Sequence, residues 1–397
     1  MKLLYVTPNF PYPPHRGYSL MAYHHIEHLS KRHMVDLISF VNAEADGFNK
    51  GGLTEWCRQI ETVALPTWQS VLTLGLRFFR REPFQVSFLH SSKMAEIINH
   101  RLRTQSYDGV IFQLTRMAQY RPDWYKGPTL LSMVDPFVLN YQRSLAWRPW
   151  YMRQVLHFEI KRLKTYESRQ ARLFDRVLLI SAADVRDYSP LLPGAKMDWV
   201  PHGVDVNNFQ VTDTPRQVGR IVLCGSMFFA PNVDAVEYFC RKIFPLVRQQ
   251  APEAKLWLVG SRPAAAVRKW AADPHIEVTG FVPDVRPYLS QAMVSVCPVR
   301  LNVGTQTKVL ESLAMGTPVV TTSAGNQGIG AVSGEHLYVA DSPTEFAEKV
   351  VSLLKKEKWK ELSENGRQFV VENFTWEKSV VKLEYILNQV AKERVAG

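Results

Sequence analysis

Short apolar runs alternate with longer amphipathic stretches along both halves of the chain. In the first half the runs cover residues 2–7, 35–41, 108–114, 129–135 and 176–181, and in the second half residues 220–226, 254–260, 276–282, 294–299 and 318–322. Apolar runs of this length are typical of buried parallel strands, and the stretches between them are long enough for helices. The pattern therefore predicts an α/β fold with two parallel sheets covered by helices.

The apolar alternation is interrupted once, near the middle of the chain. Polar residues and Pro215 follow residues 201–209, which indicates a linker. A chain of 397 residues also exceeds the usual size of a single core. We expect a first domain over residues 1–200, a second over residues 201–375, and a C-terminal helix over about residues 376–397 that packs back on the first domain.

The composition is that of a folded, soluble protein. Hydrophobic residues make up 46% of the chain and charged residues 21%, which excludes wholesale disorder, and no run reaches the ~20 apolar residues of a spanning helix. The N-terminus is interrupted by Thr7 and Asn9, so it favours a first strand over a signal peptide. The four cysteines have no metal-ligand spacing, and Cys224 and Cys297 lie in strand patterns. We expect a cytoplasmic protein with reduced, buried thiols.

The positive charge is concentrated in certain segments. Residues 143–172 carry eight Lys or Arg against two Glu, interleaved with aromatic residues, and residues 68–84 combine apolar residues with three arginines. Such helical faces can lie on an anionic membrane, and the alternative is a solvated helix edge with ordinary core aromatics. Nucleic acid is not expected as a partner, because no nucleic-acid motif accompanies the charge.

The most informative segment covers residues 294–322 and reads as a strand, a glycine loop, a helix and another strand. Ligands of parallel sheets bind at the carboxyl ends of the strands, where this loop is expected. On a helix starting near Thr305, residues 310, 313 and 314 form a buried stripe, while Lys308 and Glu311 share another face. Gly304 and the free N–H groups of the helix N-terminus would make a diphosphate cradle.

One turn along this helix, the Glu311 carboxylate could accept hydrogen bonds from both hydroxyls of a ribose. The alternative is that Lys308 and Glu311 form a surface ion pair and that Gly304 is a loop glycine. Spacing alone does not decide between these interpretations.

The sequence LNVGTQTKVLESLAMGTPVVTT (residues 301–322) resembles the donor-binding signature of the retaining glycosyltransferases of family four. The resemblance extends to PNFPYPPHRGYSL, FDRVLLISAAD, VPHGVDVNNF, GSMFFAPNVDAVEYF and FTWEKSVVKLE, and so covers nearly the whole chain. It is closest to sugar transferases of bacterial exopolysaccharide pathways. It implies the GT-B fold, in which two Rossmann-like domains face each other across a cleft, and transfer from a UDP- or GDP-linked sugar to a lipid-linked or polysaccharide acceptor.

The resemblance transfers to individual residues with two departures. Glu311 matches the acid that holds the ribose, whereas Val303 stands where the family has its first acid. The family's arginine and lysine after the first strand of the second domain are also missing, and we expect Arg300 and Lys308 to replace them. The expected donor-binding residues are Arg16, Gly17, Gly225, Ser226, Phe281, Val282, Val303, Gly304, Thr305, Lys308 and Glu311.

Asp135, Arg300 and Lys308 are the expected catalytic residues. Asp135 follows an apolar run and could orient the acceptor hydroxyl, although an Asp before Pro is also a common turn former. Ser181 and Asp184 match a family motif and are explained by helix capping. In the segment of residues 202–205 we expect hinge structure.

No cofactor is expected besides the nucleotide sugar, and the reaction is expected to be independent of metal. The histidines are interpreted as surface or core residues, and no Asp-x-Asp lies at a strand end. A nucleotide-sugar epimerase and a catalytically inactive nucleotide-sugar-binding scaffold remain alternatives, and Val303 favours the second. A dehydrogenase is more remote, because no strand is followed by G-x-G-x-x-G.

Overall fold

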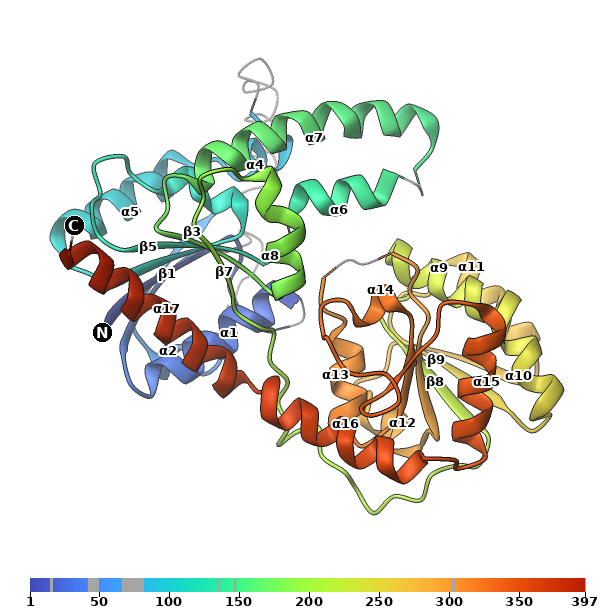
Figure 1. The fold of residues 1–397 in the computed structure, drawn as a ribbon. Coiled ribbons are helices and arrows are strands. Elements are labelled where there is room, and N and C mark those ends of the chain that lie inside the picture. Colours follow the sequence, from blue (N-terminus) through green and yellow to red (C-terminus); the bar gives the residue numbers. More distant parts are fainter. Residues whose placement is uncertain are drawn as a thin grey trace. The chain divides into compact units, whose positions relative to one another are not determined.

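The computed structural model describes residues 1–14, 17–41, 50–65, 82–134, 136–145, 148–301 and 304–396. The chain forms two compact units (Figure 1). Unit 1 comprises Met1–Pro201 and Ser379–Gly397, and unit 2 comprises His202–Lys378. Within the described residues, each unit is built on one sheet in which all neighbouring strands are parallel.

The sheet of unit 1 has the strand order β3-β2-β1-β4-β5-β6-β7. The chain runs outwards from β1 to β3 and then restarts on the other side of β1 with β4, which is the switch of direction found in doubly wound sheets. The strands are β1 (Lys2–Thr7), β2 (Met34–Val41), β3 (Cys57–Ala64), β4 (Gly109–Gln113), β5 (Thr129–Val134), β6 (Arg176–Leu179) and β7 (Met197–Trp199).

Helices cover both faces of this sheet, because alternate side chains of a strand point to opposite faces. Leu4 of β1 packs in one core with Ile98 of α5 and Leu163 of α7. Tyr5 points the other way, where its hydroxyl lies 3.2 Å from His25 Nδ1 of α1. The helices of unit 1 are α1 (Gly17–Ser30), α2 (Leu53–Trp56), α4 (Phe84–Phe88), α5 (Ser92–Thr104), α6 (Phe137–Ser144), α7 (Trp150–Ala171), α8 (Ala182–Tyr188) and α17 (Trp376–Ala396), with 3₁₀ helices η2 (Thr115–Tyr120) and η4 (Ser189–Leu191).

Helix α17 returns to unit 1 from Ser379 onwards and is held there by a buried polar chain. The Ser379 hydroxyl donates to the Pro201 carbonyl at 2.6 Å, and His25 Nε2 lies 3.0 Å from the same hydroxyl oxygen. His25 therefore carries its proton on Nε2, and Nδ1 accepts from Tyr5. The two points at which the chain leaves and re-enters unit 1 are thus tied together.

Helix α7 fixes the N-terminus of α6 with a buried carboxylate. Glu167 accepts hydrogen bonds from the Tyr188 hydroxyl, from Thr115 Oγ1 at 3.1 Å and from the backbone N–H groups of Phe137 and Val138. Burial raises the pKa of Glu167 to about 7 against these favourable bonds. The first-turn N–H groups of α6 thus have a side-chain acceptor.

Glu159, two turns earlier on α7, serves the N-terminus of α4 in the same way. It accepts from the Phe84 N–H at 2.6 Å and from the Gln85 N–H, and Arg162 lies 3.9 Å away. Burial raises the pKa of Glu159 to about 7. Both acidic residues of α7 are therefore turned towards the interior of unit 1.

The sheet of unit 2 has the strand order β10-β9-β8-β11-β12-β13. Its strands are β8 (Arg220–Cys224), β9 (Lys255–Val259), β10 (Ile276–Gly280), β11 (Val294–Cys297), β12 (Val319–Thr321) and β13 (Tyr338–Val339). Leu223 of β8 packs with Val236 of α9 and Val350 of α15, whereas Val222 packs with Leu289 of α12. The helices are α9 (Ala230–Tyr238), which continues through a π-helical turn η5 (Phe239–Ile243) into α10 (Phe244–Gln250), α11 (Ala265–Arg268), the 3₁₀ helix η6 (Lys269–Ala272), α12 (Arg286–Gln291), α13 (Thr307–Ala314), α14 (Ser323–Asn326), α15 (Pro343–Leu354) and α16 (Trp359–Asn373).

The α/β prediction is confirmed, and each predicted apolar run contains a strand. Three strands were not predicted, because β3 is a partly exposed edge strand with the polar sequence CRQIETVA, and β7 and β13 have only three and two residues. The four cysteines are buried and free. No helix in the described part of the chain is long and apolar enough to cross a membrane.

We predict that Glu167→Ala lowers the free energy of unfolding by about 3–5 kcal/mol, because two hydroxyls and two backbone N–H groups lose their buried acceptor. Glu167→Gln keeps one acceptor oxygen and should cost less. Urea unfolding followed by circular dichroism measures both, with exposed Glu364→Ala on α16 as the control. A loss at Glu167→Ala no larger than at Glu364→Ala would contradict this role.

Candidate nucleotide site

Glycines at the carboxyl ends of β8 and β9 allow these two strand ends to approach closely. A Cβ atom on Gly260, which follows β9, would lie 1.7 Å from the Gly225 carbonyl oxygen, so no side chain fits there. A Cβ atom on Gly225 would lie 2.9 Å from Asn232 Nδ2 and 3.3 Å from Lys308 Nζ. Because Gly225 has no side chain, the Asn232 side chain of α9 and the Lys308 side chain of α13 can lie directly against the turn after β8.

Lys308 is held at this turn by Asn232. The Lys308 ammonium donates to Asn232 Oδ1 at 2.5 Å, and Asn232 Nδ2 donates to the Ser226 carbonyl at 3.1 Å. The positive charge thus lies beside Gly225, in the first turn of α13, where free backbone N–H groups also favour an anion. Asn232 was not among the expected site residues, although it closes the G-S-M-x-x-x-P-N turn.

Helix α13 is fixed at its other end by two arginines from distant segments. Arg216 donates to the carbonyls of Met315 and Gly316 at 3.1 Å each, and Arg367 donates to the carbonyl of Ala314. Burial lowers the pKa of Arg216 to about 10, which leaves it protonated at neutral pH. Cations at the C-terminal end of a helix interact favourably with its dipole and with its free carbonyl groups. These contacts hold α13 in place, with its N-terminus at the turn after β8.

Glu311 differs from the other shielded acids in having no partner. Its side chain is half-buried, and it has no hydrogen bond or ion pair with any residue in the described ranges. Burial raises the pKa of Glu311 to about 7, and the nearby charge of Lys308 only partly opposes this. The predicted stripe of Leu310, Leu313 and Ala314 is buried, so Glu311 lies on the predicted separate face.

Arg300 has an acidic partner instead of an open position. Its guanidinium binds both carboxylate oxygens of Asp234, with Nε at 2.9 Å, and stacks on the Tyr238 ring at 5.0 Å. These contacts raise the pKa of Arg300 and keep it on α9. Of the two cations expected to serve the diphosphate, Lys308 is the one placed beside Gly225.

The remaining expected residues are only partly brought together. Gly304 has a φ of +82°, and Thr305 Oγ1 donates to the Gly328 carbonyl at 3.3 Å, which positions the loop before α13. Phe281 follows β10 and is 76% exposed, and Val282 is half-buried. Gly17 belongs to unit 1, where it begins α1. Arg16, Asp135 and Val303 lie outside the described residues.

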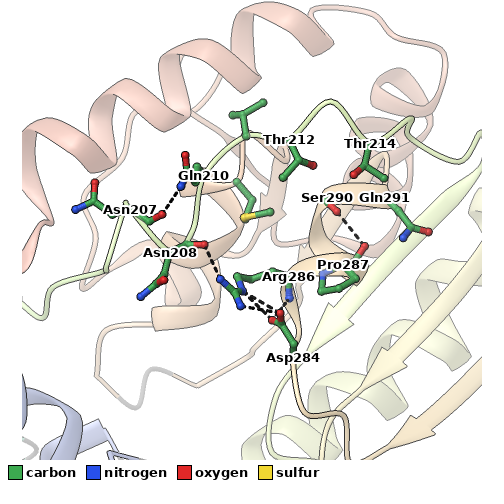
Figure 2. A pocket seen from close by; sticks show the side chains of 12 residues that line it. Asn207, Asn208, Gln210, Thr212, Thr214, Asp284, Arg286, Pro287, Ser290 and Gln291 are labelled. Carbon is green, nitrogen blue, oxygen red and sulfur yellow. Dashed lines mark hydrogen bonds and ion pairs between the residues drawn. The ribbon is translucent and has the colours of Figure 1, made fainter.

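Two cavities of unit 2 flank α12 and share Asp284, Pro287 and Gln291. One, of about 460 Å³, is polar and is drawn in Figure 2, where Arg286 points to Asp284 and to the Asn208 carbonyl. None of the expected donor residues lines it. The other, of about 500 Å³, contains Trp257, Tyr288 and the expected donor residue Val282. The chemistry of Lys308 and Glu311 therefore lies in neither cavity.

The capping prediction for Ser181 is confirmed, because its Oγ accepts from the Asp184 N–H at 3.0 Å. One group of histidines has the spacing of metal ligands. His24 and His28, one turn apart on α1, and Glu27 each offer a ligand atom, and these atoms lie within 4.8 Å of one another. This group belongs to unit 1 and shares no residue with the site at α13.

We predict that Glu311→Gln stabilises the protein more at pH 8 than at pH 5. An acid whose folded pKa of about 7 exceeds its unfolded value destabilises the fold increasingly from about pH 4.5 to pH 7, because the folded state holds the proton more tightly. The gain at pH 8 should exceed that at pH 5 by about 1–2 kcal/mol, allowing for partial exposure.

Urea titrations at the two pH values test this, with exposed Glu253→Gln as the matched control. An equal effect of Glu311→Gln at both pH values would mean that Glu311 is not desolvated in the folded protein.

Comparisons with known proteins agree with this architecture. Residues 219–356, which contain β8, β11 and α13, match the family model described as "Glycosyl transferases group 1". A Klebsiella pneumoniae protein described as an uncharacterized 44.6 kDa protein in the cps region is 22% identical over 394 residues, covering 94% of this chain and 96% of the relative.

Solved structures show the same fold at low identity. Sucrose-phosphate synthase from Thermosynechococcus elongatus superposes with a TM-score of 0.73 at 16% identity, covering 98% of this chain and 99% of the other. HepE from Anabaena in complex with UDP superposes with a TM-score of 0.67 at 12% identity, covering 98% and 100%. The chain therefore has the GT-B fold of two Rossmann-like domains, and the match to the group 1 glycosyl transferase model lies within unit 2.

Proposed function

We propose that this protein transfers a sugar from a nucleoside diphosphate sugar to an acceptor hydroxyl, and that the donor binds at α13. The single observation that carries the proposal is the half-buried carboxylate of Glu311, which has no hydrogen bond or ion pair with any described residue and whose pKa is raised by burial. A partly desolvated carboxylate that lacks hydrogen-bond donors from the protein destabilises the fold, and a bound ligand that supplies the donors would offset this cost. The two neighbouring hydroxyls of a ribose could each donate a hydrogen bond to this carboxylate. The matching family model covers this helix.

The surroundings of Glu311 suit the departure of a diphosphate. Negative charge grows on the leaving group as the glycosidic bond to it breaks, and the Lys308 ammonium and first-turn N–H groups of α13 would stabilise it. Asn232 orients Lys308 for this purpose. We further propose that the reaction retains the anomeric configuration and needs no metal ion, as the resemblance to family four implies.

A UDP- or GDP-linked sugar is the proposed donor. HepE, which has the same fold, is described in complexes with UDP and with UDP-glucose. UDP is therefore the first nucleotide to test by thermal shift. A ligand at 100 times its dissociation constant adds about 2.7 kcal/mol of stability, which such a shift detects.

The proposed acceptor is a lipid-linked or polysaccharide intermediate of bacterial cell-surface glycan synthesis. The relative in the cps region of Klebsiella pneumoniae supports this proposal, as does the resemblance to exopolysaccharide sugar transferases. Such an acceptor would place the protein in the cytoplasm, in peripheral contact with the inner face of the membrane.

A nucleotide-binding scaffold without catalysis is the second candidate, and Val303 in place of the family's first acid favours it. Incubation with a labelled donor separates the possibilities. Labelled product that forms only with acceptor supports a transferase, an isomerised donor would indicate an epimerase, and binding without turnover would indicate a scaffold.

We predict that Glu311→Ala weakens nucleotide binding by at least about a hundredfold, because two hydrogen bonds to a charged acceptor together contribute on the order of 3 kcal/mol. Isothermal titration with UDP or GDP measures the loss, and Glu253→Ala is the control. Unchanged affinity in folded Glu311→Ala protein would remove Glu311 from the site.

We also predict that Lys308→Ala, and to a smaller extent Arg300→Ala, lowers kcat more than it weakens donor binding, because the negative charge of the leaving group grows in the transition state. Lys308→Ala should have the larger effect, since Arg300 is already neutralised by Asp234. Steady-state kinetics beside direct donor titration measure both quantities. Equal losses in kcat and in affinity would mean that these cations serve only in binding.

A further inference from the structure

The first three turns of α7 are exposed although they are rich in large apolar side chains. Figure 1 shows α6 and α7 side by side, with the start of α7 at the end of this hairpin that lies away from the sheet of unit 1. Residues 148–155, 157 and 158 are all exposed. The exposed apolar side chains are Trp150 (76%), Tyr151 (57%), Met152 (37%), Val155 (55%) and Phe158 (52%). These side chains are therefore not part of the buried core of unit 1.

The three exposed aromatic side chains share one face of the helix with a lysine. At about 100° per residue, Trp150, Tyr151, Phe158 and Lys161 fall within about 100° of one another. The opposite face carries Leu163, which is fully buried in the core of unit 1. Val155 lies next to the aromatic face, whereas Met152 lies on the side of Leu163. The core of unit 1 covers Leu163 and leaves the aromatic face exposed.

The exposed charges of α7 all have the same sign. Glu159 and Glu167 are buried, because they cap α4 and α6, and Arg162 is also buried. The four exposed charged residues that remain on the helix are Arg153, Lys161, Lys164 and Arg169. The two capping carboxylates stabilise neighbouring helices. Because they are buried, every charged side chain on the exposed surface of α7 is positive.

We propose that this outer face of α7, called here the α7 surface (Trp150, Tyr151, Val155, Phe158, Arg153, Lys161 and Lys164), docks on a membrane of anionic phospholipid. Tryptophan and tyrosine favour the headgroup boundary, and each Lys or Arg near it gains from the negative surface potential. The inference rests on the proposed function, to which it adds the surface that meets the membrane of a lipid-linked acceptor.

Charge argues against a second copy of the chain as the occupant. A two-fold contact would place the α7 surface against itself and so bring like charges together. An anionic bilayer offers the complementary charge over the whole length of the helix, about 33 Å for 22 residues.

The experiment measures co-sedimentation of the full-length protein with vesicles of phosphatidylcholine alone and with vesicles of equal parts phosphatidylcholine and phosphatidylglycerol. The protein should bind the anionic vesicles and be released by salt. Trp150→Ala/Phe158→Ala and Lys161→Glu/Lys164→Glu should each weaken binding by about tenfold or more. Tyr385→Ala on α17 and Lys242→Glu in unit 2 remove an exposed aromatic ring and reverse an exposed charge outside the surface, and should change nothing.

No binding to anionic vesicles at low salt, or equal binding of all variants, overturns the inference. Self-association that Trp150→Ala/Phe158→Ala abolishes, without vesicle binding, would also overturn it. UDP and GDP titration of the same proteins keeps the two proposals apart. Nucleotide binding without vesicle binding contradicts only the docking surface, whereas vesicle binding without nucleotide binding contradicts the proposed function.

Discussion

Parallel pairing of the strands sends the carboxyl end of every strand in a sheet to the same edge, and the candidate site depends on this constraint. In unit 2 it brings the turns after β8, β9 and β11 and the N-terminus of α13 together from separate segments of the chain. Gly225 and Gly260 make the close approach possible, since a Cβ atom at Gly260 would overlap the backbone of the other turn. Arg216 and Arg367 hold the far end of α13, which keeps Lys308 and Glu311 at that edge.

The shielded carboxylates show how a structural acid differs from a candidate site acid. Burial raises the pKa of Glu159, Glu167 and Glu311 to about 7 in each case. Glu159 and Glu167 accept hydrogen bonds from helix N-termini, so their burial supports the fold and shapes the charge of α7. Glu311 has no such partner within the described ranges, although α13 is otherwise firmly held. A raised pKa alone would not have separated these roles.

Much of the fold could be predicted from the sequence because buried parallel strands are continuous apolar runs. The edge strand β3 is partly polar, and the two-residue strand β13 is too short to carry a pattern, so both depend on tertiary pairing. Within α13, spacing placed Lys308 and Glu311 on one face apart from the buried stripe. Spacing could not show that Asn232 holds Lys308 or that Asp234 neutralises Arg300, because these contacts join residues 76 and 66 positions apart.

The central claim is that Glu311 accepts the hydroxyls of a donor ribose, and a double-mutant cycle on the ligand tests it most directly. Isothermal titration would compare UDP with its 2′,3′-dideoxy analogue on the wild-type protein and on Glu311→Gln. We expect the wild type to bind the dideoxy analogue at least about tenfold more weakly than UDP, and we expect this difference largely to disappear in Glu311→Gln. Equal binding of both ligands by the wild type, or the same difference in both proteins, would contradict it.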